Sequence, residues 1–121
     1  MSIFDNIQED KKLHISENFY IIEDQYPVSP GHLLIISKSS KSDYFNLDEN
    51  EKKELTELID IAKGLIESKH QPNGFNIGMN CGTDAGQTIM HFHCHIIPRY
   101  KGDVDDPTGG VRNVIPGKGV Y

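Results

Sequence analysis

Three histidines alternate along residues 91–97, which read His-Phe-His-Cys-His-Ile-Ile. In a β-strand every second side chain points to the same face, so His91, His93 and His95 would form one row of imidazoles opposite a core-facing row of apolar side chains. Two strand residues advance about 6.6 Å, so neighbouring rings in the row can contact a common ligand. A solvated strand face would be expected to carry Ser, Thr or Lys, so three imidazoles there indicate chemistry.

Two kinds of chemistry suit such a row. Two histidines of a His-x-His strand can bind a metal ion when a third ligand comes from elsewhere. Alternatively, one imidazole attacks as a nucleophile while its neighbours orient it and bind an anion. The other histidines, His14, His32 and His70, have no second ligand at a standard metal spacing. We therefore predict no bound metal and keep metal-dependent hydrolysis as the less favoured alternative. His14 and His70 are expected to be ordinary surface or edge residues.

The residues just before the row are suited to binding an anion. Gly82 and Gly86 let the backbone approach a ligand and turn N–H groups toward it. Gln87 and Thr88 add hydrogen-bonding side chains. His32, which follows a Pro-Gly pair, could bring a fourth imidazole to the same region. Imidazoles, loop amides and a hydroxyl, with no carboxylate in the row, predict a phosphate pocket.

Length and charge limit what the protein can be. The chain has 121 residues, enough for one domain with a real core and too few for two. We predict a single domain over residues 1–121, with an irregular tail over about 101–121. The net charge is −6, and residues 1–89 carry eight basic and fifteen acidic side chains. This balance argues against a nucleic-acid binder, while the net charge of +1 over residues 90–121 remains compatible with a small phosphate ligand.

Composition also bears on the compartment. No apolar run approaches the roughly 20 residues needed to cross a bilayer, so we expect no membrane span. The N-terminal residues have no basic segment followed by an apolar one, so we expect no signal peptide. The two cysteines, Cys81 and Cys94, are few for a disulfide scaffold. These features predict a cytoplasmic protein.

Residues 48–69 carry the strongest helix pattern. Asp48 can cap the N-terminus, with Glu51 three residues later in a capping box. An apolar stripe recurs at helical spacing and comprises Leu55, Leu58, Ile59, Ala62, Leu65 and Ile66. Six acidic residues between positions 48 and 60 are expected to form a solvated face that complements the helix dipole, rather than a binding site.

Strand patterns lie on both sides of this helix. The predicted strands cover residues 12–16, 19–24, 32–37, 75–80 and 88–98. Residues 2–9 are expected to form a turn or a short helix. Strands joined by short loops predict an antiparallel sheet of about five strands, so the fold class is α+β with one long helix and a short N-terminal helix. We also predict a homodimer, because the apolar helix stripe and the tail offer surface to bury.

The stretch 91–97 resembles the motif of the histidine triad (HIT) family, His-x-His-x-His followed by two apolar residues. The resemblance extends through Ala85-Gly86-Gln87-Thr88 before it, Pro98-Arg99 after it, and the block 27–36 upstream. With the intervening helix it covers roughly residues 2–100. Members are nucleotide hydrolases and transferases that cleave at an α-phosphate, commonly as homodimers. The resemblance therefore implies a HIT-like fold and a nucleotide substrate.

The resemblance implies a role for each histidine. His93 would attack the α-phosphorus and form a nucleotidyl-histidine that water later hydrolyses. His95 would donate to phosphate oxygens and help the leaving group. His91 would belong to the supporting hydrogen-bond network, with His32 near it.

Substrate-binding residues also follow from the resemblance. Asp24 stands where the family places a ribose-binding acid or amide, and a carboxylate can accept from both ribose hydroxyls. Asn80 matches a position that contacts the phosphate chain in relatives. Gln87 and Thr88 would line the phosphate and leaving-group side.

One feature of the family is missing. Some bacterial relatives carry Cys-x-x-Cys near the N-terminus and a further histidine after the third strand, which together hold a structural zinc ion. The corresponding stretches here are Ser2-Ile3-Phe4-Asp5 and Ser39-Ser40-Lys41, which contain neither. We therefore expect no zinc and no tightly bound cofactor. Magnesium is expected only as an ion bound to a polyphosphate substrate.

The implied reaction is hydrolysis of a nucleoside 5′-phosphate derivative, such as diadenosine tetraphosphate, with release of AMP or another nucleoside monophosphate. Pro98-Arg99 after the motif resembles the dinucleoside polyphosphate branch more than the phosphoramidase branch. Two alternatives stay open: an adenosine 5′-phosphoramidase, and a nucleotide-binding regulatory protein with incidental turnover. All three histidines of the triad are present, which argues for active chemistry.

Overall fold

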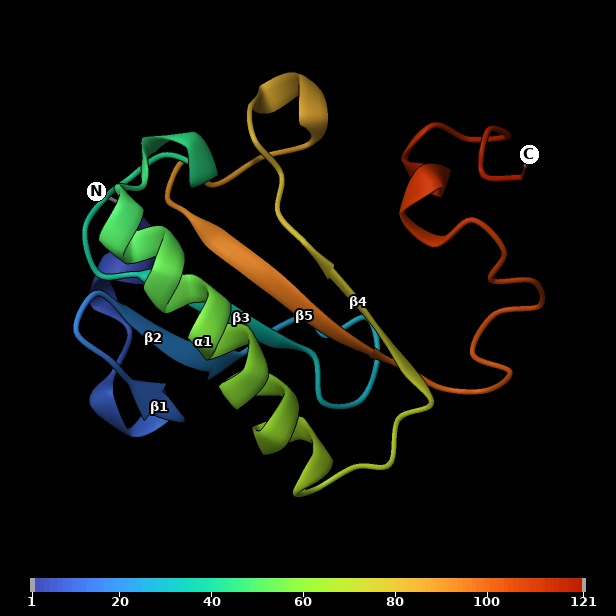
Figure 1. The fold of residues 1–121 in the computed structure, drawn as a ribbon, viewed down its shortest axis with the longest axis horizontal. Helices are drawn as coiled ribbons and strands as arrows, with labels where there is room; N and C mark the ends of the chain where they lie inside the picture. Colours follow the sequence, from blue (N-terminus) through green and yellow to red (C-terminus); the bar gives the residue numbers. More distant parts are fainter. Residues whose placement is uncertain (1, 121) are drawn as a thin grey trace.

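An antiparallel sheet carries one long helix on one of its faces in the computed structural model, which describes residues 2–120 (Figure 1). The strands are His14–Ile15 (β1), Phe19–Glu23 (β2), Leu33–Ser37 (β3), Gly74–Gly78 (β4) and His93–Arg99 (β5). Their order across the sheet is β1-β2-β3-β5-β4, and every neighbouring pair is antiparallel. The helix α1 spans Glu49–Glu67, between β3 and β4 in the chain. The predicted α+β class is confirmed.

The helix begins and packs where the sequence predicts. The Asp48 carboxylate accepts from the Glu51 backbone N–H at 2.8 Å, and the Glu51 side chain accepts from the Asp48 N–H at 2.9 Å. The buried residues of the apolar stripe are Leu55, Leu58, Ala62 and Ile66. Burying them against the sheet removes apolar surface from water and fixes the helix there. The stripe therefore belongs to the chain's own core and does not offer the dimer surface that we predicted from it.

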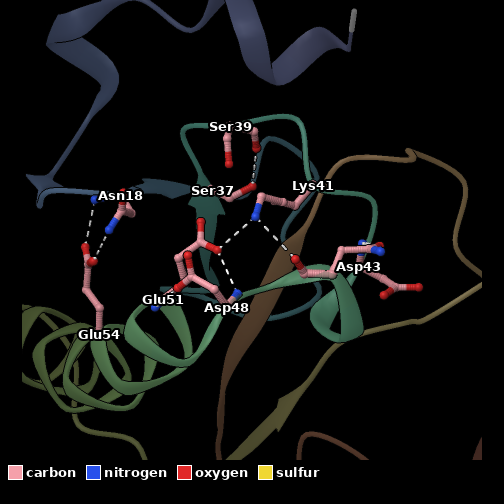
Figure 2. Close-up of polar contacts among 9 residues, drawn as sticks. Asn18, Ser37, Ser39, Lys41, Asp43, Asp48, Glu51 and Glu54 are labelled. Carbon is pink, nitrogen blue, oxygen red and sulfur yellow. Dashed lines mark hydrogen bonds and ion pairs between the residues drawn. The ribbon is translucent and has the colours of Figure 1, made fainter.

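Two acidic side chains of the helix form polar contacts with other parts of the chain (Figure 2). Glu51 is buried and accepts from the Lys41 ammonium at 3.1 Å. Glu54 accepts from the Asn18 backbone N–H at 2.9 Å, from the Asn18 side-chain amide at 2.8 Å, and from the Ser16 hydroxyl. Burial alone would raise the pKa of Glu54, but the hydrogen bonds from Ser16 and Asn18 outweigh it and lower the pKa. The predicted solvated face is therefore wrong for these two residues, which attach α1 to the β1–β2 turn and to the loop after β3.

The sheet separates two clusters of buried apolar side chains. The cluster facing α1 includes the strand residues Phe19, Ile21, Leu33, Ile35, Cys94 and Ile96. The cluster on the other face comprises Phe4, Tyr20, Ile22, Leu34 and Ile36. Because side chains alternate along a strand, His93 and His95 lie on this second face, paired in register with Ile36 and Leu34.

Short N-terminal turns cover part of the second face. The predicted N-terminal helix consists of two 3-10 turns, Ile3–Asn6 (η1) and Glu9–Lys11 (η2). Phe4 is buried in the second cluster, and its carbonyl accepts from the Tyr20 hydroxyl. Burial, and then the charge of Asp5, raise the pKa of Tyr20 to about 12, so the phenol keeps its proton and remains a donor. The turn η1 is thereby anchored beside the histidine strand.

The histidine strand begins later than predicted. β5 starts at His93 rather than at residue 88 or 89, because the preceding residues bond to the loop after β3. The Phe92 N–H donates to the Lys41 carbonyl at 2.6 Å, and the Gln87 side-chain amide donates to the Ser42 carbonyl at 2.6 Å. His91 therefore precedes the strand, and the prediction of three imidazoles in one row is wrong for His91.

The far edge of the sheet is β4, which pairs with β5 on one side. Its Ile77 residue is 45% exposed.

The predicted irregular tail contains one 3-10 turn, Gly110–Val114 (η5), and is mostly exposed. In Figure 1 the tail folds back on itself rather than joining the sheet. Within residues 2–120, no helix is both long and apolar enough to cross a membrane.

Candidate active site

A cavity of about 440 Å³ opens on the second face of the sheet, and His93 and His95 line it. Its apolar wall consists of Ile3, Phe4, Ile7, Ile22, Leu34 and Ile89. Its polar lining consists of Asp24, Gln25, Tyr26, Asn80, Gly86 and Thr88. An apolar wall beside a few polar groups is the usual composition of a small-molecule site.

The cavity brings together residues that lie far apart in the sequence. Of the predicted site residues, Asp24, Asn80, Thr88, His93 and His95 line it directly. The other three stand behind this lining. They are His32, Gln87 and His91, and each is buried.

Gln87 shapes the loop instead of lining the phosphate side as predicted. Its side-chain oxygen accepts from the Gly82 N–H at 2.8 Å, and its amide nitrogen donates to the carbonyls of Ser42 at 2.6 Å and Ile89 at 3.1 Å. Both polar atoms of the side chain are therefore engaged. Gly82 and Gly86 have φ angles of 100° and 95°, which glycine adopts without strain. Gln87 and the two glycines thus define the course of the loop whose Gly86 and Thr88 reach the cavity.

His93 is held through one ring nitrogen. Its Nδ1 lies 2.8 Å from the carbonyl oxygen of His91. A carbonyl can only accept, so Nδ1 carries a proton and, in the neutral ring, Nε2 does not. Such an imidazole, with a free nitrogen lone pair at the wall of a cavity, is arranged as a nucleophile.

His32 determines which nitrogen of His95 carries the proton. The Val28 N–H donates to His32 Nδ1 at 3.2 Å, so His32 carries its proton on Nε2. That Nε2–H faces His95 Nδ1 at 2.9 Å and the Asp24 carboxylate at 3.3 Å. His95 accepts at Nδ1 and therefore bears its own proton on Nε2, from which it can donate to a ligand. His32 thus contacts His95 rather than the region of His91 where we predicted it.

The environment keeps these two rings neutral. The pKa of His95 is lowered to about 4, first by burial and then by the neighbouring His93 and His32, against the opposing effect of Asp24. Burial also lowers the pKa of His32, again against the effect of Asp24. Near pH 7 both imidazoles are therefore uncharged. The two hydrogen bonds, from the Val28 N–H to His32 and from His32 to His95, require this state.

His91 is enclosed on all sides and is 1% exposed. Its Nε2 lies 2.6 Å from the Ser37 carbonyl oxygen, and its Nδ1 lies 2.7 Å from the Ser2 hydroxyl oxygen. The Phe4 ring meets the His91 ring edge-on at a centroid distance of 5.6 Å. His91 therefore acts on the cavity through its backbone carbonyl, which holds His93.

Asp24, His32 and His95 form a cluster whose polar atoms all lie within 4.8 Å of one another, close enough for a metal ion. The sequence did not indicate this cluster because the three residues are brought together only by the sheet. A metal on His32 Nε2 would require the ring proton to move to Nδ1, toward which the Val28 N–H already points. The hydrogen bonds thus favour a chain of N–H donors over a metal centre, and the absence of a metal stays a prediction.

Comparison with known proteins agrees with this geometry. The HIT domain model matches residues 6–102. The chain belongs to the HIT, or histidine triad, family. An AP-4-A phosphorylase of Mycobacterium tuberculosis is 37% identical over 100 residues, which cover 80% of this chain and 51% of that protein. An asymmetrical bis(5'-nucleosyl)-tetraphosphatase of Schizosaccharomyces pombe is 36% identical over 80 residues, which cover 66% of this chain and 44% of that protein. This HIT chain thus spans about half the length of these curated relatives.

Solved structures place the fold in the same family. A hypothetical histidine triad nucleotide-binding protein from Sulfolobus tokodaii superposes with a TM-score of 0.72 at 36% sequence identity. The match covers 79% of this HIT chain and 64% of that chain. The family resemblance predicted from the triad motif is therefore confirmed.

Sequence reasoning did not predict the part of the apolar wall that comes from the N-terminal segment, which comprises Ile3, Phe4 and Ile7. Nor did it predict Tyr26, a polar lining residue in the loop after β2. The only local signal is the spacing of three apolar residues in an otherwise polar segment, which equally suits a turn packed on the core. Only the fold shows that these side chains border the two histidines of the HIT site.

Proposed function

We propose that this HIT protein cleaves a nucleoside 5′-phosphate derivative at the α-phosphate, through a covalent nucleotidyl-histidine on His93. Diadenosine tetraphosphate or another dinucleoside polyphosphate is the leading substrate, and AMP or another nucleoside monophosphate is released. One observation carries the proposal: two imidazoles with complementary protonation line the same cavity, 5.3 Å apart between ring centroids. His93 offers a lone pair at Nε2 and His95 offers an N–H at Nε2.

The first step of the proposed reaction uses both rings. The Nε2 lone pair of His93 forms a bond to the α-phosphorus, and the bond from phosphorus to the leaving phosphate oxygen breaks, so the leaving group departs with that electron pair. The nucleotidylated ring gains positive charge, which the His91 carbonyl stabilises by accepting from Nδ1–H at 2.8 Å. The His95 N–H donates a hydrogen bond to the oxygen on which negative charge develops.

The second step returns the enzyme to its starting state. A water molecule adds to the phosphorus while the bond to His93 Nε2 breaks, and the electron pair of that bond returns to the ring. The proton lost by the water passes to solvent, and the nucleoside monophosphate leaves. Splitting the displacement in this way replaces one difficult step by two easier ones.

The remaining lining fits the parts of a nucleotide. The apolar wall of Ile3, Phe4, Ile7 and its neighbours suits a flat nucleobase. One oxygen of Asp24 accepts from the Tyr26 N–H at 2.8 Å, and as a carboxylate it keeps lone pairs for ribose hydroxyls. Asn80 and Thr88 line the same cavity and can supply hydrogen bonds to a phosphate chain.

Two observations favour a dinucleoside polyphosphate over a phosphoramidate. A larger open groove of about 840 Å³ adjoins the cavity and shares Ile7, Ile22, Asp24 and Gln25 with it, which leaves room for a second nucleoside. His95 is also neutral near pH 7, because its pKa is lowered to about 4. It can donate a hydrogen bond to a polyphosphate that leaves as an anion. The amine that leaves a phosphoramidate needs a full proton instead. If the neutral His95 ring gave up its single N–H proton, it would become an imidazolate anion, which is unfavourable.

Intact-protein mass spectrometry after brief mixing with diadenosine tetraphosphate tests the proposal. We expect a transient AMP-sized adduct on the wild type, with AMP released. His93→Ala should show no adduct and a turnover lowered by roughly three or more orders of magnitude. His14→Ala, outside the cavity, serves as the matched control and should keep its activity. A folded His93→Ala protein that loses only a few fold would exclude the covalent mechanism, and wild-type protein that binds AMP without turnover would identify a nucleotide-binding regulator.

We also propose that the protein is a homodimer joined along β4. This strand is the edge of the sheet, and an edge strand presents backbone groups to another chain. Ile77 on this strand adds an exposed apolar side chain. Light scattering at micromolar concentration should give twice the chain mass, and Ile77→Lys should shift the equilibrium toward the monomer. A wild-type monomer under these conditions would refute the dimer.

A further inference from the structure

We infer that Ser2 is a positioning residue, whose hydroxyl holds the nucleophile His93 in its reactive form by acting through His91. The inference rests on the proposed function of His93. Ser2 lies 89 residues before His91 in the chain, and its hydroxyl oxygen is 2.7 Å from His91 Nδ1. Ser2 does not line the cavity, so it would act without touching the substrate.

The direction of each hydrogen bond in this chain is determined by its partners. The Ser37 carbonyl can only accept, so His91 donates from Nε2 at 2.6 Å. The neutral His91 ring then has a bare Nδ1, which must accept. The Ser2 hydroxyl is therefore the donor, and its oxygen in turn accepts from the Phe4 N–H at 3.1 Å. One arrangement of protons satisfies every one of these groups.

The N-terminal turn holds Ser2 in this position. Ser2 caps η1, and its backbone N–H donates to the Asp5 carboxylate at 2.8 Å in a capping box. The same turn carries Phe4, which contacts the rings of both His91 and His93 at centroid distances of 5.6 and 5.1 Å. The serine hydroxyl is thus placed by a structured element that is itself packed on the histidine pair.

His91 passes this constraint to the nucleophile. Its backbone carbonyl accepts from His93 Nδ1–H at 2.8 Å, which keeps Nε2 of His93 free of a proton. His91 is 1% exposed, so water has little access to replace a missing hydroxyl. Without Ser2 O–H, Nδ1 of His91 would be a buried acceptor with no donor, which is costly. The imidazole would rotate toward another partner. Because the ring and the carbonyl belong to the same residue, this rotation would shift the carbonyl that orients His93.

Steady-state and rapid-mixing kinetics on diadenosine tetraphosphate test the inference with Ser2→Ala and Ser2→Thr. We expect Ser2→Ala to lower kcat and the rate of adduct formation by about tenfold while KM changes by less than about twofold. Ser2→Thr keeps the hydroxyl and should restore kcat. Ser68→Ala is the matched control, because that hydroxyl donates to the Leu65 carbonyl at the far end of α1. A higher KM at unchanged kcat would overturn the inference, since it would mean that Ser2 only anchors the wall of the nucleoside pocket.

Nitrogen-15 NMR of the imidazole rings provides a measurement that does not depend on turnover. The wild type should show an unprotonated Nδ1 in His91 and an unprotonated Nε2 in His93, and Ser2→Ala should change both patterns. Unchanged ring tautomers together with unchanged kcat would overturn the inference. If Ser2→Ala does not fold, Ser2→Cys, with its weaker donor, replaces it and should give an intermediate kcat. If the wild type forms no adduct, the proposed function fails, while the NMR comparison still decides whether Ser2 controls the two rings.

Discussion

Removing the donor that His32 presents to His95 should slow catalysis with little effect on substrate binding. His32 does not line the cavity, and its Nε2–H determines that His95 carries its proton on the nitrogen available to a ligand. His32→Leu deletes this donor. His32→Gln can place an amide N–H near the same position, so the two variants differ mainly in the hydrogen bond under test.

The expected size of the effect follows from the structure. The bond from His32 to His95 is 2.9 Å long, and the His32 side chain is 2% exposed. A buried hydrogen bond of this kind contributes on the order of 1–1.5 kcal/mol, and about 1.4 kcal/mol corresponds to a tenfold change in rate. We therefore expect His32→Leu to lower kcat for diadenosine tetraphosphate roughly tenfold or more, and His32→Gln to lose only a few fold.

Chromatographic measurement of AMP release over a range of substrate concentrations separates kcat from KM for both variants. Thermal unfolding of each protein shows whether the fold survives, because both substitutions leave the Val28 N–H without its present acceptor. Equal kcat values for the two folded variants would refute the role of the Nε2–H donor. A rise in KM alone would mean that His32 supports the pocket and not the chemistry.

Two predictions concern stability. The pKa of His95 is lowered to about 4 in the folded protein, mainly by burial, whereas an unfolded histidine ionises near 6.5. Between these values the unfolded chain binds more protons, so the free energy of unfolding should fall as the pH falls, by about 2 kcal/mol from pH 7 to pH 5 for this group. Urea unfolding at both pH values measures it, and a His95→Asn protein with the same pH slope as the wild type would contradict it. Glu54→Ala should lower the free energy of unfolding by about 1–3 kcal/mol, because it removes the acceptor that holds Asn18 and Ser16. Glu57→Ala, on the exposed part of the same helix, is the control and should change it by less than about 0.5 kcal/mol.

Local patterns predicted the elements where a single periodicity dominates. The capping box at Asp48 and the stripe from Leu55 to Ile66 placed α1 within two residues of its ends. The alternation of His93 with Cys94 and His95 correctly divided that strand between a core face and a cavity face. Prediction failed for His91, because hydrogen bonds to the loop after β3 compete with continuation of the strand.

The sequence by itself determined the family, the α+β class and the positions of the three triad histidines, because these depend on residue types at short fixed spacings. Only the tertiary structure decided how those histidines are protonated. For His91 and His95, the bonds that do so join residues 54 apart, in Ser37 and His91, and 63 apart, in His32 and His95. Strand register brings these pairs within hydrogen-bonding distance, and a shift of register by one residue would turn the rings to the opposite face. The residue types of the triad are therefore present in the motif, while their proton arrangement is a property of the folded sheet.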